Sequence, residues 1–431
     1  MQAKFLQVVL MALTAVMALG FQPVLAEAIP LDSKGLPQWQ VRQWDDFPVE
    51  LRVAGAQGLQ ELLARVPLAA FNREDFSPDG TLHVRVTAAE AAALQRAGVA
   101  YQRLPDLERK GRQALEESWA ERAAGGEVPT RTAAKSDAAA LTYYPTHAQI
   151  GTLQNDLMTL NPAICDTFIW GQSVLGRDLW GVVISADVHN TTAEPEVRLS
   201  GTMHGNEVLG MVMLVDLAHH LVENYNQPGY SALTDLVNST EIHIMPLHNP
   251  DGYASGQRYN ANGEDLNRNY WLPNGNDPTP EIENQHFMDY ANVHHFVVSQ
   301  NGHGGSLVVN YPWDYTYALA PDDAALIKLS LEYSTTNLPM YTNPQFSQGI
   351  TNGAAWYVAN GTLQDWSYDQ TDCIDVTVEL GYDKTPSEAS LAGFWDDNRE
   401  SLLNYVAAAH YGINGVVTDG VSGAPLDAEV T

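Results

Sequence analysis

The chain has 431 residues, of which 45% are hydrophobic, so it is long enough for two or three domains with packed cores and is not a largely disordered protein. Its 22 Lys and Arg residues oppose 52 Asp and Glu residues, which gives a formal net charge of −30. Because so acidic a chain repels nucleic acid and anionic membranes, neither is an expected partner.

The acidic charge is concentrated in the second part of the chain. Before Tyr143 there are 15 basic and 17 acidic residues, whereas from Tyr143 onward there are 7 basic and 35 acidic residues. Regions with such different charge balances are expected to be separate domains, with a boundary near residue 140. An exposed, salt-tolerant surface is the simplest explanation of the acidity, and attraction of cationic substrates is the alternative.

Residues 1–26 predict a signal for export. Lys4 precedes an apolar run from Phe5 to Leu19, and small residues allow cleavage after Ala26. This pattern is typical of a secretory signal peptide, and the run is short for a membrane-spanning helix. We therefore expect a secreted or periplasmic protein without membrane insertion.

The chain has two cysteines, Cys165 and Cys373. Outside the cytoplasm such a pair is able to form a disulfide. The sequence does not show whether the two side chains meet, so buried free thiols are an equal alternative.

Residues 27–105 predict a small α+β domain. Alternating apolar residues predict its strands, and Thr87 and Gly98 are placed to begin and end its second helix. The expected strands are Val49–Val53, Leu82–Val86 and Val99–Leu104, and the expected helices are Leu59–Val66 and Ala88–Ala97. None of these segments carries a pattern of catalytic residues.

Residues 106–142 predict a polar, Ala-rich connector. Basic residues gather in it, namely Arg109, Lys110, Arg112, Arg122, Arg131 and Lys135. Exposed connectors of this kind are preferred sites of proteolysis. We therefore expect processing that releases a pro-segment, and a plain flexible linker is the alternative.

Strands and helices alternate from residue 143 to residue 411, which is the order of an α/β domain with a central sheet covered by helices. The expected strands are Leu179–Ser185, Glu196–Gly201, Glu241–Leu247, His294–Ser299 and Asp375–Leu380. The expected helices are Leu209–Asn224, Glu281–Asn292, Ala324–Asn337 and Glu400–Tyr411. Residues 412–431 begin a further strand and turn, so we expect the start of another β domain.

A His and a Glu three residues apart follow the strand expected at Glu196–Gly201. His204 and Glu207 lie at a glycine-containing junction between that strand and a helix, where both side chains can turn toward one metal ion. Imidazole and carboxylate ligands suit zinc. The same spacing recurs at His220 and Glu223 late in a helix, where an exposed helix face is the simpler interpretation, so the spacing alone does not decide the first pair.

Two of the seven basic residues after Tyr143 lie in a region rich in Asn and Asp. Arg258 and Arg268 follow the turn at Asn249–Gly252, and Arg268 lies within the segment Asp265–Asn269. A guanidinium group pairs bidentately with a carboxylate, so these arginines favour recognition of an anion. Ion pairs with acidic neighbours explain them equally well.

His303 and Glu379 stand at the ends of two further expected strands. His303 comes after the strand at His294–Ser299 and is followed by two glycines, so it is a third possible zinc ligand that leaves a fourth position open for water. Taken alone, a loop histidine without a metal is the better explanation. Glu379 lies in an apolar strand, where a carboxylate is costly unless it is paired or functional, and it is a possible general base.

Taken together and in order, these motifs resemble the zinc metallocarboxypeptidase family. They are His204-x-x-Glu207, Asn249–Gly252, Asp265–Asn269, His303–Ser306 and Glu379. Within the family, Gly353–Tyr357 and Gln364–Trp366 resemble the regulatory branch of carboxypeptidases N, E, D and M. The resemblance covers residues 143–411 and implies an α/β fold with a mixed eight-stranded central sheet covered by helices. Residues 27–105 loosely resemble a carboxypeptidase pro-domain, and residues 412–431 resemble the start of a transthyretin-like β-sandwich domain.

The resemblance implies one zinc ion and a catalytic carboxylate. The implied zinc ligands are His204, Glu207 and His303. Asp265 would orient His204 through its other ring nitrogen. Glu379 would act as general base and then as general acid, and Arg258 would stabilise the negative charge that develops on the scissile carbonyl.

The resemblance also implies a site for the C-terminal residue of a peptide. Asn267 and Arg268 would bind the terminal carboxylate, and Tyr357 would close over the substrate. Asp314 and Gln364 would lie in the pocket for the last side chain, where an acid favours Lys or Arg. A turn-capping role is the alternative for Asp314, which follows Pro312. One departure from the family is Gly302, where an apolar residue is usual, but it removes no functional group.

The sequence therefore predicts an exported zinc metallocarboxypeptidase that removes C-terminal Lys or Arg from peptides and proteins. One alternative is a carboxypeptidase of the same fold with an apolar preference, against which Asp314 argues. A second is a zinc amidohydrolase of small acylated amino acids; Arg268 and Tyr357 argue for peptides, although both kinds of substrate can carry a carboxylate. A third is a non-catalytic peptide-binding module, against which the complete set of metal and catalytic residues argues. The absence of a Gly-x-Ser-x-Gly motif disfavours a serine hydrolase.

Overall fold

The computed structural model describes residues 46–68, 76–77, 79–125, 140–190, 194–273, 275, 277–412, 417–424 and 426. The chain divides into two units, Met1–Val41 and Arg42–Thr431, and all described residues belong to the second unit. The expected signal peptide at residues 1–26 therefore lies outside the described residues. None of the described helices is long and apolar enough to cross a membrane.

The N-terminal domain is a three-stranded antiparallel sheet with two helices, as the sequence predicts. Its elements are β1 (Asp46–Arg52), α2 (Gly55–Arg65), β2 (Thr81–Thr87), α3 (Ala88–Arg96) and β3 (Tyr101–Arg103), and the strand order is β2-β1-β3. Thr87 caps α3 in a reciprocal arrangement with Glu90, so the predicted start of this helix is confirmed. Alternating strand residues and the apolar faces of the helices form a separate small core.

The first part of the expected connector is a helix, α4 (Leu107–Gly125). The guanidinium group of Arg112 is buried and donates to the backbone carbonyls of Tyr253 and Ala254, at 2.8 Å each. Arg122 pairs with Glu388 at 3.2 Å. These contacts attach α4 to the domain that follows. Residues 126–139 lie outside the described residues.

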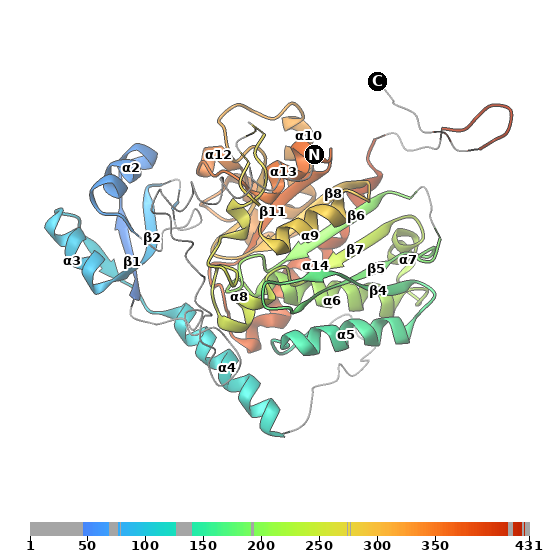
Figure 1. The fold of residues 1–431 in the computed structure, drawn as a ribbon, viewed down its shortest axis with the longest axis horizontal. Helices are drawn as coiled ribbons and strands as arrows, with labels where there is room; N and C mark the ends of the chain where they lie inside the picture. The colour runs from blue at the N-terminus through green and yellow to red at the C-terminus, as the bar shows by residue number, and fades with distance from the viewer. Residues whose placement is uncertain are drawn as a thin grey trace, which may run out of the picture. The chain divides into compact units, whose positions relative to one another are not determined.

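The second domain contains the predicted eight-stranded mixed sheet (Figure 1). Its strands are β4 (Cys165–Gln172), β5 (Asp178–Ile184), β6 (Glu196–Gly201), β7 (Glu241–Met245), β8 (Phe296–His303), β9 (Leu307–Tyr311), β10 (Ile350–Asn352) and β11 (Ile374–Leu380). They are ordered β10-β9-β11-β8-β6-β7-β5-β4. The four central strands β11, β8, β6 and β7 run parallel, so their carboxyl ends meet at one edge of the sheet.

Helices cover both faces of this sheet. They are α5 (His147–Leu160), α6 (Leu209–Asn224), α7 (Ser231–Val237), α8 (Pro250–Ser255), α9 (Ile282–Ala291), α10 (Asp323–Ser334), α11 (Leu338–Tyr341), α12 (Gly353–Trp356), α13 (Leu363–Gln370) and α14 (Leu391–Ala407). The helices α5, α6, α10 and α14 share one core, whereas α9 and α13 pack on the other face, which has a second core rich in aromatic side chains (Figure 1). The fold is α/β, as predicted.

Several predicted elements differ from the observed ones in their bounds, among them the following two. The strand expected at His294–Ser299 is β8 (Phe296–His303), so His303 is the last residue of the strand and does not follow it. Pairing with β6 and β11 on both sides extends β8 through polar Asn301 and through Gly302. The helix expected at Glu400–Tyr411 begins earlier, at Leu391.

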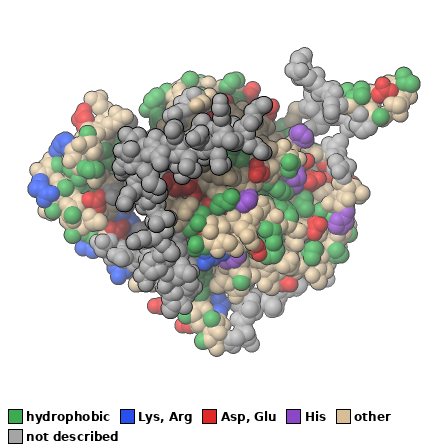
Figure 2. Space-filling model, in the orientation of Figure 1, with side chains coloured by type: hydrophobic (Ala, Val, Ile, Leu, Met, Phe, Trp, Pro, Cys, Tyr) green, Lys and Arg blue, Asp and Glu red, His purple; other side chains and the backbone are tan. Residues whose placement is uncertain are grey.

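The charge asymmetry of the sequence is also visible on the surface. On the face drawn in Figure 2, Lys and Arg side chains gather over the N-terminal domain and α4, and few lie over the sheet and helices of the second domain. Both cysteines are buried as free thiols, and burial raises the pKa of each to about 12. Among residues 417–424 and 426, three backbone hydrogen bonds form a short turn: Leu426 donates to the carbonyl of Val417, Asp419 to that of Ala424, and Gly423 to that of Asp419.

Candidate active site

Three candidate metal ligands converge at the carboxyl ends of β6 and β8. His204 and Glu207 lie between β6 and α6, and His303 ends β8. Nδ1 of His204 lies 2.9 Å from Oε2 of Glu207, and Nδ1 of His303 lies 3.0 Å from each of these two atoms. All three side chains are buried. Two imidazole nitrogens and a carboxylate oxygen that face one another at these distances fit the ligand set of a zinc ion with one position left open.

Close backbone packing brings these ligands together. A Cβ atom on Gly205 would lie 2.0 Å from the carbonyl carbon of Gly252, so only glycine lets the loop after β6 meet α8. A Cβ atom on Gly302 would lie 3.0 Å from Cα of Gly210, at the start of α6. A larger residue at position 302 would therefore push α6, and with it Glu207, away from His303. This contact is a physical reason for the departure from the family pattern at Gly302.

Asp265 lies on the far side of His204 from the ligand cluster. Its Oδ1 is 3.0 Å from Nε2 of His204, and its Oδ2 accepts from Nε of Arg258 at 3.0 Å. Burial would raise the pKa of Asp265, but the positive charges of Arg258 and His204 lower it well below its usual range. The carboxylate is therefore ionised and fixes the imidazole so that Nδ1 faces the other two ligands.

Replacing Asp265 with Asn is expected to weaken zinc binding by about 10- to 100-fold, because His204 loses the carboxylate that orients its ring. The affinity is measured by competition with a chromophoric chelator. The circular dichroism spectrum controls for folding. Zinc affinity equal to that of the wild type would contradict the orienting role of Asp265.

The second His-x-x-Glu pair, His220 and Glu223, does not belong to a group of three possible metal ligands within the described part of the chain. On α6, Glu223 pairs with His219 at 3.1 Å, and His220 contacts the side chain of Asn224. The predicted exposed helix face is wrong, however, because His220 is buried and packs against Trp395. The helix α6 packs against α14 on the face that the sequence pattern suggested was exposed.

A small pocket opens beside the ligand cluster. Its lining contains six of the residues singled out in the sequence: His204, Arg258, Asn267, Arg268, His303 and Glu379. Glu379 enters it because β11 runs parallel to β8, with Glu379 directly opposite His303. The structure thus brings a possible general base next to the candidate metal site.

The two arginines of the pocket have different surroundings. Arg258 pairs with Asp265 and lies 3.3 Å from Oε1 of Glu207, so the ion-pair alternative describes its contacts. Arg268 donates to the backbone carbonyl of Asn267 at 2.7 Å, and no carboxylate of the described residues lies within 4.0 Å of its guanidinium group. Arg268 is therefore the better placed of the two to bind an anion in the pocket.

Asp314 and Gln364 lie together behind the pocket lining. The amide nitrogen of Asn310, which does line the pocket, is 3.3 Å from Oδ1 of Asp314 and 3.3 Å from Oε1 of Gln364. Gly353 permits this arrangement, since a Cβ atom there would lie 1.8 Å from Oδ1 of Asp314. The structure thus groups the two residues predicted to select the last side chain, with Asn310 between them and the pocket.

Tyr357 is the predicted site residue that lies apart from this pocket. It follows α12, is half-buried, and packs against the core of the N-terminal domain. Its neighbour Trp356 lines the pocket and donates through Nε1 to the carbonyl of Phe76 at 2.6 Å. The segment around Tyr357 is thus covered by the N-terminal domain.

Three residues of the site were not predicted from the sequence motifs. Asn310 and Thr377 line the pocket, and Nζ of Lys384 lies 3.3 Å from Oε1 of Glu207. Burial would raise the pKa of Glu207, but His204 and Lys384 lower it well below its usual range. Lys384 had a sequence signal, since it is one of the seven basic residues after Tyr143 and follows Glu379 by five positions.

A buried cluster of metal ligands beside a glutamate and an arginine defines the site of a metal-dependent hydrolase. The profile of the zinc carboxypeptidase family matches residues 150–401, which is more than half of the chain. The chain therefore belongs to the zinc carboxypeptidase family, and the predicted family and enzyme class, a zinc metallocarboxypeptidase, are confirmed.

Curated relatives agree with this family. Carboxypeptidase D of Rattus norvegicus is 42% identical in an alignment 291 residues long, which covers 61% of this chain and 21% of the relative. The carboxypeptidase N catalytic chain of Homo sapiens is 35% identical in an alignment 308 residues long, which covers 60% of this chain and 67% of the relative. The matched part thus spans about a fifth of the length of carboxypeptidase D.

Solved structures share the fold. Carboxypeptidase A from Helicoverpa armigera aligns with a TM-score of 0.70 and 17% identity over 85% of this chain and 97% of that chain. Thrombin activatable fibrinolysis inhibitor aligns with a TM-score of 0.66 and 17% identity over 85% of this chain and 99% of that chain. Residues 143–411 are 269 of the 431 residues, which is less than the 85% of the chain that these alignments cover. The similarity of fold therefore extends into the N-terminal domain.

Proposed function

We propose that this protein is a zinc-dependent exopeptidase that hydrolyses the last peptide bond of peptides and proteins and prefers C-terminal Lys or Arg. The observation that carries the proposal is the convergence of His204, His303, Glu379 and Arg268 on one pocket. These residues supply metal ligands, a proton-transfer group and an anion-binding group within reach of one substrate.

The residues of the pocket divide the chemistry among them. Zinc, when bound by His204, Glu207 and His303, activates water and polarises the scissile carbonyl. Glu379 takes a proton as water attacks and then delivers a proton to the leaving amine. Arg258, held in place by Asp265, stabilises the negative charge that develops on the carbonyl oxygen.

Arg268 explains why cleavage would be limited to the C-terminal residue of a substrate peptide. With no carboxylate partner among the described residues, its guanidinium group is available for the terminal carboxylate of a peptide, which Asn267 helps to hold. An internal peptide bond offers no such carboxylate. A requirement for a free C-terminus therefore follows from the binding group and not from the hydrolytic chemistry.

Asp314 supports the preference for a basic last residue. Its side chain is 1% exposed and lies with Gln364 behind Asn310. The negative charge of this buried carboxylate favours a cationic last side chain, and an apolar side chain offers no such attraction. Lys or Arg supplies the positive charge.

The proposal is tested by comparing release of C-terminal Arg and Phe from otherwise identical N-blocked dipeptides, with and without a zinc chelator. We expect chelator-sensitive release of Arg and little release of Phe. A preference for Phe would retain the enzyme class and contradict the role of Asp314. Release of neither residue by the zinc-loaded protein would favour the amidohydrolase or the binding module.

Replacing Asp314 with Asn is expected to lower kcat/KM for the Arg substrate by about 100-fold, because the cationic side chain loses its counter-charge while the packing volume is kept. kcat/KM for the Phe substrate should be unchanged or higher. Asp166→Asn on the edge strand β4 is the control and should leave both values within about twofold. An equal fall for both substrates would indicate a structural role for Asp314.

We also propose that residues 27–105 are a pro-domain, that residues 106–142 contain its processing site, and that residues 412–431 begin a transthyretin-like domain. The contact of Phe76 with Trp356, which lines the pocket, supports a pro-domain that covers the substrate side of the pocket. Arg109 and Lys110 are exposed on α4, whereas Arg112 is buried. Exposed basic residues are the better processing sites.

Limited trypsin digestion tests this arrangement. We expect cleavage between residues 106 and 142 and a rise in activity as the N-terminal domain is released. Full activity before cleavage would contradict the covering role. The proposed signal peptide at residues 1–26 is tested by N-terminal sequencing of the exported protein, which should begin near residue 27.

A further inference from the structure

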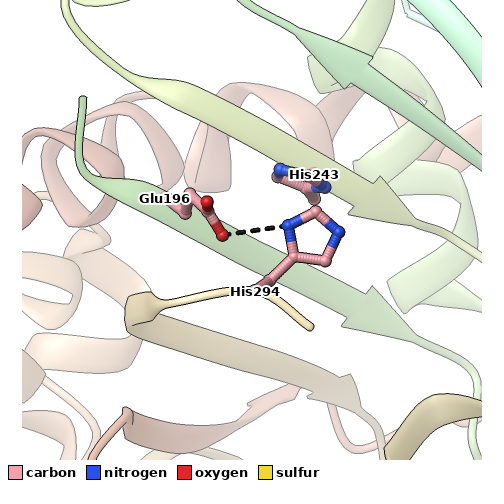
Figure 3. Close-up of side chains that lie close together, drawn as sticks. All are labelled: Glu196, His243 and His294. Carbon is pink, nitrogen blue, oxygen red and sulfur yellow. Dashed lines mark hydrogen bonds and ion pairs between the residues drawn. The ribbon is translucent and has the colours of Figure 1, made fainter. Parts of the chain in front are cut away.

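A second cluster of possible metal ligands lies at the opposite edge of the sheet from the pocket. Glu196 begins β6, His243 lies within β7, and His294 lies in the turn before β8 (Figure 3). Because β7, β6 and β8 are adjacent and parallel, their amino ends meet at one edge. The length of β6 separates this cluster from the catalytic ligands by roughly 17–20 Å.

The three side chains point toward one another. Nδ1 of His294 is 3.0 Å from Oε2 of Glu196, and one ligand atom from each residue lies within 4.8 Å of the other two. The rings of His243 and His294 are 4.7 Å apart between centroids, at an angle of 67°. Ligand atoms around a tetrahedral zinc ion are about 3.4 Å apart, so modest rotations of these side chains would complete a site.

Neighbouring groups hold the cluster in position. Nε2 of His243 contacts Oε1 of Glu241 at 2.9 Å. Its Nδ1 contacts the hydroxyl of Tyr290 at 2.6 Å, and an ion bound to Nδ1 would displace this hydroxyl. The backbone N–H of His295 donates to Glu196 at 2.9 Å. A carboxylate on the second nitrogen of a histidine ligand and a hydrogen bond to a carboxylate ligand are usual supports of metal sites.

The local charge favours a cation. Glu196 and Glu241 place two carboxylates at this edge, and among the described residues their only ion-pair partners within 4.0 Å are His294 and His243. No Lys or Arg of the described residues neutralises them. A divalent cation would balance this charge with the imidazoles neutral.

The cluster is both anchored and accessible. The side chain of His243 is 2% exposed, whereas those of His294 and Glu196 are 22% and 21% exposed. Tyr290, Phe296 and Phe168 form an apolar wall on one side. An ion can therefore enter from solvent, bind the buried side chain of His243 and retain a water molecule.

We propose that Glu196, His243 and His294 bind a second divalent transition-metal ion, for which Zn²⁺ is the expected species. Two imidazoles and one carboxylate form a ligand set that suits zinc better than the hard cations Mg²⁺ or Ca²⁺. The ion joins the turn before β8 to the first residues of β6 and to β7, and it takes no part in peptide hydrolysis. A hydrogen-bonded network without metal is the competing explanation.

Metal stoichiometry distinguishes the two explanations. The full chain is dialysed against buffered Zn²⁺, and bound zinc is measured by mass spectrometry. We expect about two zinc ions per chain in the wild type and about one in His294→Ala and in Glu196→Gln. His303→Ala, which removes a catalytic ligand, should retain the second ion. Circular dichroism establishes that each variant is folded, and the Glu196→Gln variant keeps the side-chain volume in case His294→Ala is unstable.

A matched control comes from another His–Glu pair. His83 lies 3.0 Å from Glu50, the same distance as in the cluster, but no second histidine of the described residues joins this pair in a group of metal ligands. His83→Ala should keep both zinc ions, and His294→Ala should keep its activity toward the Arg substrate because the catalytic ligands are intact. One zinc ion in the wild type would overturn the proposal, and so would two in the wild type and in both cluster variants.

Discussion

Replacing Glu379 with Gln is expected to lower kcat for a C-terminal Arg substrate by about 10³- to 10⁴-fold. Glutamine keeps the volume of this buried side chain but cannot accept and return a proton. Its position opposite His303 in the parallel pair of β11 and β8 places the lost group beside the ligand cluster. Zinc content should be unchanged, since His204, Glu207 and His303 are intact.

Kinetics and metal content together test this expectation. KM should change little, because Arg268 and the other groups that bind substrate remain. The control is Glu223→Gln on α6, where the carboxylate pairs with His219 away from the pocket, and its kcat should stay within about twofold of the wild type. A fall in activity that follows loss of zinc would assign Glu379 to metal binding, and activity near that of the wild type would remove it from the mechanism.

Replacing Asp375 with Ala is expected to destabilise the protein by about 3–5 kcal/mol. Asp375 on β11 pairs with Arg198 on β6 at 3.1 Å, and both side chains are fully buried. The register of the parallel strands places Ser299 of β8 between them, and its hydroxyl accepts from Arg198. Removing the carboxylate would leave the guanidinium charge buried without its ion-pair partner.

Urea unfolding measures the effect as a shift of the midpoint at constant slope. The control is Glu332→Ala, which breaks an exposed pair with Lys328 and should cost under about 1 kcal/mol. Adding Arg198→Met to Asp375→Ala should recover part of the loss, with a coupling free energy of about 1–3 kcal/mol, because the unpaired charge is gone. Additive losses would show that the two residues stabilise the sheet independently.

Elements with a strong local pattern could be predicted from the sequence alone. The strand Glu196–Gly201 and the helix Leu209–Asn224 have the observed bounds, since alternating apolar residues that end in glycine predict a short strand and a long apolar segment predicts a helix. The strand β10 (Ile350–Asn352) could not be predicted, because three residues become a strand only through pairing with β9. The prediction of a connector at residues 106–142 was wrong for its first part, which forms the helix α4. This helix is stabilised by contacts of Arg112 and Arg122 with a distant part of the chain.

The residues of the candidate site also divide into those that the sequence could identify and those that it could not. His204, Glu207, His303 and Glu379 could be identified from residue type, order and resemblance to a family. Asn310 could not, since an Asn in a strand has no distinctive pattern and its importance comes from contact with Asp314 and Gln364, which lies 54 positions away. No sequence pattern predicts the cluster of Glu196, His243 and His294, because these residues are far apart in the chain and meet only at one edge of the sheet.

The sequence by itself determined the family, the α/β order of the second domain and the types of residue available for catalysis, because these depend on local patterns and on chemical identity. Only the tertiary structure decided which residues meet. His303 and His204 are 99 positions apart and come within 3.0 Å because parallel strands end at one edge of the sheet. The same arrangement brings Glu196, His243 and His294 together at the opposite edge. Strand order and register are set by the packing of the whole domain, and no short segment contains that information.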